Sequence, residues 1–182
     1  YTLSAGFIYG AFIGYLSSAR QVFQTTYQLG PLFALFFGMA ALAIGSASIC
    51  NSRLVMRLGM RLLSRRALIS LSVLSLSFLV PTFIYHGMPP LWLFMGWLLG
   101  TFFCIGMLFG NFNALAMEPL GHIAGLGAAL LGSVSTLISL PLGWMIGHFY
   151  DGTVLPLVAG FAVLGLMSLG MMTWTERGRV PD

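Results

Sequence analysis

The chain has 182 residues, of which 58% are hydrophobic and 7% are charged. An ordinary soluble domain is about 45–50% apolar and about 25% charged. So few charges cannot solvate a surface, so the composition excludes a soluble enzyme and indicates an integral membrane protein.

Long apolar runs divide the chain into predicted membrane helices. A span needs ~20 mostly apolar residues, and we expect six of them, at residues 3–23, 32–50, 67–85, 91–117, 125–148 and 154–174, within a unit of residues 1–175. Gly30-Pro31, Met88-Pro89-Pro90 and Asp151-Gly152 punctuate the sequence between runs. Residues 176–182 are expected to form a cytoplasmic tail. Because the first apolar run begins almost at Tyr1, without a charged leader, we expect the chain to be part of a longer protein.

The arginines predict which way the helices face. All eight basic residues are arginine, and five of them, Arg53, Arg57, Arg61, Arg65 and Arg66, lie between the second and third runs. If that loop is cytoplasmic, Arg177 and Arg179 are also inside, and only Arg20 is outside. Cytoplasmic loops are enriched in arginine and lysine. We therefore expect both ends of the chain to be cytoplasmic, and this pattern does not indicate nucleic-acid binding.

Glycine is distributed unevenly among the predicted helices. The first run has Gly6, Gly10 and Gly14 at four-residue spacing, the fifth run has five glycines, and the third run has none. Small residues let membrane helices approach closely. The first, fourth and fifth helices are therefore expected to be central or at an interface, and the third to face lipid.

The sequence shows no pattern typical of catalysis, metal binding or a cofactor. No ionisable residue lies near the middle of a predicted helix, where one would mark an ion or substrate path. The remaining candidates for a substrate cavity are polar or aromatic residues at intermediate depth: Tyr9, Tyr15, Arg20, Gln21, Gln24, Asn111 and Asn113. Each has a plainer alternative, since the tyrosines suit packing, the 20–24 cluster suits a solvated helix end, and the asparagines suit bridges between helices.

The loop at residues 51–61 resembles the basic loop of the major facilitator superfamily. Arg57, Gly59 and Arg61, with Arg53 nearby, match the version found in the second half of those transporters, whereas Met56 replaces an aspartate. Residues 17–24, 113–119 and 122–132 are similar to the C-terminal six helices of Bcr/CflA-type drug-resistance antiporters. Arg20 departs from that pattern, because the family usually has a proline there.

The resemblance implies an all-α integral membrane fold, with six transmembrane helices forming one half of a twelve-helix major facilitator fold. It implies that the first and fourth helices line the cavity, that the third and sixth face lipid, and that the second and fifth contact an N-terminal six-helix half. The fifth helix would make that contact through Gly125, Gly132, Gly143 and Gly147.

The implied function is proton-coupled multidrug efflux by alternating access in a bacterial inner membrane. The implied partners are the lipid bilayer, protons, and a small amphipathic drug-like substrate, with no cofactor. The family's proton-binding carboxylates lie in the N-terminal half, so we do not expect Glu118 to couple transport to protons. Two alternatives stay open: transport of a small metabolite, and a non-transporting six-helix protein that packs against a partner.

Overall fold

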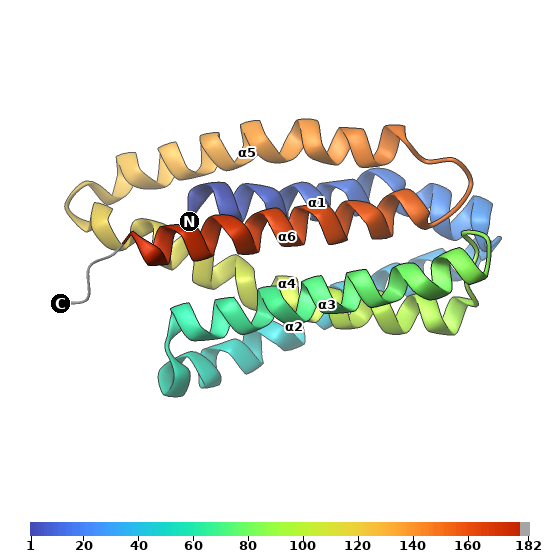
Figure 1. Ribbon diagram of the computed structural model, residues 1–182, viewed down its shortest axis with the longest axis horizontal. Helices are drawn as coiled ribbons and strands as arrows, with labels where there is room; N and C mark the ends of the chain where they lie inside the picture. Colours follow the sequence, from blue (N-terminus) through green and yellow to red (C-terminus); the bar gives the residue numbers. More distant parts are fainter. Residues whose placement is uncertain (179–182) are drawn as a thin grey trace.

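The computed structural model describes residues 1–178 as a bundle of six long helices (Figure 1). Within those residues there is no strand. The α-helices are α1 (Thr2–Arg20), α2 (Phe33–Leu58), α3 (Met60–Ile84), α4 (Leu91–Met117), α5 (Ala124–His148) and α6 (Leu155–Arg177). Three short helical segments join them: the π-helical η1 (Gln21–Thr26) and the 3₁₀ segments η2 (Gly30–Leu32) and η3 (Glu118–Ile123).

Most of this helical structure is apolar enough to cross a membrane. Within residues 1–178, four helical stretches meet that requirement by length and composition: Gly30–Leu58, Met60–Ile84, Leu91–His148 and Leu155–Arg177. The stretch Leu91–His148 contains both α4 and α5. The shorter α1, with its serines, glycines and tyrosines, is not among them. The expected all-α membrane class is confirmed.

The helices form two layers. In one layer α2 packs on α4, α4 contacts α1, and α1 packs on α5. In the other layer α3 and α6 pack on each other, and they cover α4 and α1 respectively. Figure 1 shows α3 and α6 in front of this four-helix layer. The surface of α1 and α4 that is turned away from α3 and α6 is called the open face below.

The helix contacts repeat between the two halves of the chain. If α1, α2 and α3 are exchanged for α4, α5 and α6, the α1–α5 contact becomes α4–α2 and the α1–α6 contact becomes α4–α3. All four contacts are present, and α1 and α4 run in opposite directions (Figure 1). This is the pattern of an inverted 3+3 repeat, although the sequence shows no clear similarity between the two triplets.

The predicted loop at residues 51–66 is helical except for one residue. α2 continues to Leu58, and α3 begins at Met60. Gly59 interrupts them with φ +78°, a conformation that glycine adopts without a Cβ penalty. Arg53, Arg57, Arg65 and Arg66 are exposed along these helix ends. A helix can therefore continue past the apolar run, since its charged side chains are solvated.

The seam between α1 and α5 is built on glycine. A Cβ added at Gly6 or Gly10 would lie 3.0 Å from side-chain atoms of Ile138 or Leu142, and one at Gly14 would lie 2.6 Å from Ile146 Cδ1. The three glycines share one face of α1 because they are four residues apart. Their missing side chains let the two helices approach closely, as the sequence predicts.

Candidate functional site

A bridge between α1 and α4 lies on the open face. The Asn113 amide nitrogen donates a hydrogen bond of 2.8 Å to the Tyr9 hydroxyl oxygen. The Tyr9 ring meets Phe109 edge to face at 4.8 Å, and Phe12 meets the same ring at 5.5 Å. We call Tyr9, Phe12, Phe109 and Asn113 the aromatic wall. Tyr9 is partly exposed and Asn113 is exposed, so the wall can be reached from the open face.

The polar atoms of this wall keep hydrogen-bonding capacity for a ligand. Because the Tyr9 oxygen accepts the bond from Asn113, its own O–H remains available as a donor. The Asn113 side-chain oxygen remains available as an acceptor within residues 1–178. The wall thus offers aromatic surface, one donor and one acceptor, with no charged group.

Tyr15 does not line the open face, which corrects its prediction as a cavity residue. Only 1% of its surface is exposed, and its ring packs against Phe102 at 4.6 Å and Phe37 at 5.9 Å. Its hydroxyl is buried and has no hydrogen-bond partner among residues 1–178. It lies six residues beyond Tyr9 and therefore on a different side of α1.

Asn111 also has a role other than the predicted one. It is 2% exposed and exchanges two hydrogen bonds with Asn51 of α2, of 3.0 and 2.8 Å. Each amide therefore satisfies one donor and one acceptor of the other. Asn111 bridges α2 and α4, and the cavity interpretation is wrong for this residue.

The cluster at residues 20–24 forms the rim at the end of α1. Arg20, Gln21 and Gln24 are exposed, and the Arg20 Nε donates to the Gln24 side-chain oxygen at 3.3 Å. Gln21 begins the π-helical turn η1, and its carbonyl accepts a hydrogen bond of 3.1 Å from the Tyr150 hydroxyl. π-Helical turns are rare and frequently lie at functional sites, but the sequence gives no signal for this one.

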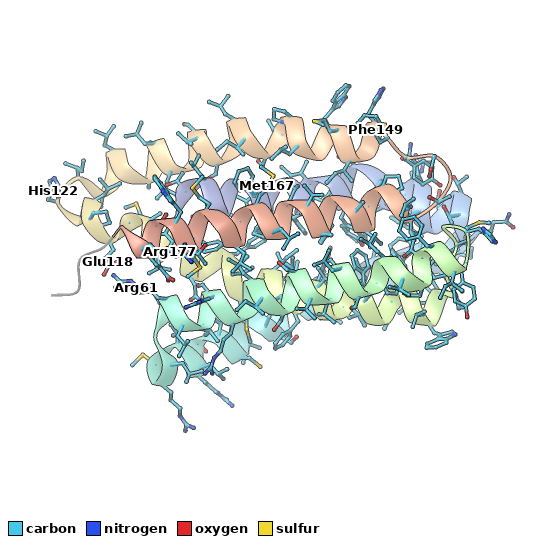
Figure 2. The ribbon with its side chains drawn as sticks, viewed as in Figure 1. Arg61, Glu118, His122, Phe149, Met167 and Arg177 are labelled. Atoms are coloured by element: carbon cyan, nitrogen blue, oxygen red, sulfur yellow. The ribbon has the colours of Figure 1, made fainter. Side chains whose placement is uncertain are left out.

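The opposite end of the bundle carries an ion pair. Arg61 Nη2 contacts both carboxylate oxygens of Glu118, at 2.9 and 3.1 Å, and both side chains are about half exposed. The hydrogen bond that Arg61 donates to the Glu118 carboxylate raises the pKa of Arg61 above its ordinary value. Figure 2 shows the pair at the end of the bundle where Arg177 and His122 lie. Glu118 is therefore held by the arginine-rich segment at this end of the bundle.

The four α5 glycines that were expected to contact another half divide into two kinds. A Cβ at Gly143 would clash with Ile13, and one at Gly147 would lie 2.9 Å from Ser17 Cβ. These two glycines pack inside this chain, which corrects their predicted role in contacting another half. Gly125 and Gly132 have open space at the Cβ position, so a role for them in such a contact stays a prediction.

Two grooves beside α5 were missed at the sequence level. One, of about 450 Å³, lies between α5 and α6, and its lining includes Phe149 and Met167 (Figure 2). The other, of about 460 Å³, lies between α1 and α5 and is lined in part by Trp144 and His148. Trp144 and His148 are four residues apart on a predicted helix, which places them on one face, but only the tertiary structure brings α1 beside them.

Comparison with known proteins supports a particular family. No protein-family model matches the chain, and no solved structure matches it. The chain is 32% identical over 183 residues to a Bacillus subtilis (strain 168) protein named as an uncharacterized MFS-type transporter, YdgK. The chain resembles a major facilitator transporter. The match covers 98% of this chain but only 44% of that relative. Together with the inverted 3+3 arrangement, it shows the fold to be one half of a twelve-helix major facilitator fold.

Proposed function

We propose that this chain is the C-terminal half of a proton-coupled multidrug efflux antiporter. It would work by alternating access against an N-terminal six-helix half in a bacterial inner membrane, with both ends of the segment cytoplasmic. The observation that supports this most is the aromatic wall, because it joins α1 and α4 on the one face of the bundle that α3 and α6 leave uncovered.

The flanks of the open face support a second half as the partner. α2 packs mainly on α4, and α5 mainly on α1, so both helices leave their outer surfaces uncovered. These surfaces are apolar and include Leu42 and Leu137, each 73% exposed, and Ile49, 64% exposed. A second half that docks on α2 and α5 would enclose the aromatic wall. Rocking of the two halves would then open that enclosure to each side in turn.

The chemistry of the wall suits a small amphipathic substrate. Aromatic faces provide contact area without demanding a particular shape, while Tyr9 and Asn113 supply one donor and one acceptor. The wall contains no acid or base, so we place the proton-binding groups in the N-terminal half. Glu118 is half exposed and paired with Arg61, which is a poor environment for a group that must titrate during transport.

A matched pair of tyrosine substitutions tests this proposal in the full-length protein. Tyr9→Phe removes the donor on the open face, whereas Tyr15→Phe removes a hydroxyl that is buried without a partner. Drug efflux is measured in proteoliposomes under an imposed pH gradient, with chloramphenicol and ethidium as substrates. Tyr9→Phe should lower efflux about tenfold, the value of one lost hydrogen bond of about 1.4 kcal/mol, and Tyr15→Phe should retain it. Equal effects, or no drug efflux by the unmodified protein, would contradict the proposal.

A further inference from the structure

The groove between the ends of α1 and α5 has the size and lining of a ligand site. Ile13 and Ser17 contribute from α1, Gln21 contributes from the start of η1, and Leu140, Trp144 and His148 contribute from α5. Its volume of about 460 Å³ falls within the roughly 300–1,000 Å³ of small-molecule pockets. The groove lies on the side of α5 away from α6, since the α6 side is the apolar groove of Leu142, Met145 and Phe149.

An aromatic stack forms one side of this groove. The His148 imidazole lies parallel to the Trp144 indole, with ring centroids 4.7 Å apart and an interplanar angle of 14°. Trp144 is 64% exposed, and His148 is also exposed. The stack therefore presents aromatic surface on which a further flat ring can pack.

The polar groups of the groove are available for a ligand. Neither ring nitrogen of His148, nor the side-chain amide of Gln21, makes a hydrogen bond within residues 1–178. Ser17 donates its hydroxyl proton to the Ile13 carbonyl at 2.8 Å, so it can only accept from a ligand. The groove thus has one donor on α5, at His148, and one on η1, at Gln21, and neither is bonded within residues 1–178.

The lining of the groove carries no negative charge. Within residues 1–178 no carboxylate lines it, and Arg20, which directly precedes Gln21, donates to Gln24. The nearest acid in sequence, Asp151, accepts hydrogen bonds from the Thr153 backbone (3.0 Å) and hydroxyl (2.6 Å), which lower its pKa. The nearby Tyr150 hydroxyl is already bonded to the Gln21 carbonyl and to Thr26. The ionisable residues of α6 are at its far end.

We propose that this groove binds aromatic carboxylates. The ligand ring packs on the Trp144–His148 stack, and its carboxylate accepts hydrogen bonds from His148 and from the Gln21 amide. This rests on the proposed function, since it makes the groove a second contact region of the export path and adds aromatic anions to the substrates.

The test uses three ligands with one ring system and different charges: 1-naphthoate, 1-naphthamide and 1-naphthylmethylammonium. Binding to the full-length protein in nanodiscs is measured by equilibrium dialysis at pH 6. The expected order of affinity at pH 6 is carboxylate, then amide, then ammonium. A hydrogen bond donated to a carboxylate is worth about tenfold in affinity, so naphthoate should bind about tenfold more tightly than the ammonium ligand.

Two substitutions at one position separate stacking from charge. His148→Phe keeps a ring against Trp144 but removes the donor, so naphthoate should lose about tenfold in affinity at pH 6. His148→Gln keeps a side-chain donor but removes the ring, so naphthoate should lose the stacking contact and keep the hydrogen bond. The control is His122→Phe, at the other end of α5 from Phe149 (Figure 2), which should leave the affinity for naphthoate unchanged.

Several results would overturn the proposal. They are absence of naphthoate binding, ammonium binding as tight as carboxylate binding, and equal effects of the His148 and His122 substitutions. The dialysis assay needs no transport. If naphthoate binds as expected but no drug is exported, the proposed function fails and the groove assignment stands. If drug export depends on Tyr9 but naphthoate does not bind, only the groove assignment is wrong.

Discussion

The glycine seam between α1 and α5 gives a quantitative prediction for Gly14→Ala. The new Cβ would lie 2.6 Å from Ile146 Cδ1 and 2.9 Å from Ile146 Cβ. A rotamer change can move Cδ1, but Cβ is fixed to the backbone of α5, so the helices must separate slightly. Overpacking of this kind typically costs about 1–3 kcal/mol.

A second glycine supplies the matched control. Gly170 in α6 has open space where its Cβ would be. Gly170→Ala should therefore stabilise the protein by about 1 kcal/mol, because alanine has the higher helix propensity. Gly14→Ala gains the same stability from helix propensity but loses the cost of the clash. The two variants should differ in stability by the clash alone, about 1–3 kcal/mol.

Thermal stability of the purified protein in detergent measures this difference. At about 2–4 °C per kcal/mol for a protein of this size, the apparent Tm of Gly14→Ala should lie roughly 2–12 °C below that of Gly170→Ala. Ile146→Ala removes the Cδ1 and Cγ2 atoms, so adding it to Gly14→Ala should cost less than the sum of the two single changes. Equal Tm values for the two glycine variants, or additive costs, would refute the close α1–α5 seam.

Three further predictions concern topology, the ion pair and the amide bridge. A cysteine at Asp151 should react with a membrane-impermeant thiol reagent in intact cells and one at Arg61 should not, whereas the reverse would invert the proposed orientation. Glu118→Gln breaks an exposed ion pair worth about 0–1 kcal/mol, so drug efflux driven by a pH gradient should continue in this variant. If the variant loses that efflux but keeps efflux down a drug gradient, Glu118 is the proton carrier. Asn111→Leu alone should destabilise the protein by about 1–3 kcal/mol, because it leaves the Asn51 amide unpaired. Adding Asn51→Leu should recover most of that loss, and additive losses in chemical or thermal unfolding would argue against the bridge.

The sequence predicts the helices well because a membrane imposes a simple rule on length and polarity. It is less informative at the ends of α2 and α3, where the apolar run stops but the helix does not. Arg53 and Arg57 can be solvated on a helix as readily as on a loop, so their charge marks the membrane boundary and not the helix boundary. The break needs a residue that tolerates positive φ, and Gly59 is that residue.

The candidate site was only partly predictable, because residue type does not tell which neighbour a helix face will meet. Tyr9 and Tyr15 are alike in sequence, but one faces Asn113 and the other is enclosed by aromatic rings. Asn111 pairs with Asn51, 60 residues away, through a register between α2 and α4 that no local pattern encodes. The same limit applies to Gly143, whose small size serves the seam with α1.

Similar apolar surfaces on opposite layers allow a direct test of the open face. Leu16, 46% exposed, lies seven residues beyond Tyr9 and therefore on the same face of α1. Val73, 58% exposed, lies on α3 in the other layer. In the open-face account a transport path passes Leu16, whereas lipid covers Val73.

The decisive measurement is the reaction of cysteines at these two positions with a water-soluble thiol reagent. It uses the full-length protein in proteoliposomes, with Cys50 and Cys104 replaced by serine. Leu16→Cys should react, and a transported drug should slow the reaction, while Val73→Cys should stay unlabelled with or without drug. Equal labelling at the two positions, or labelling at position 16 that no drug slows, would contradict the claim that the open face lines a substrate path.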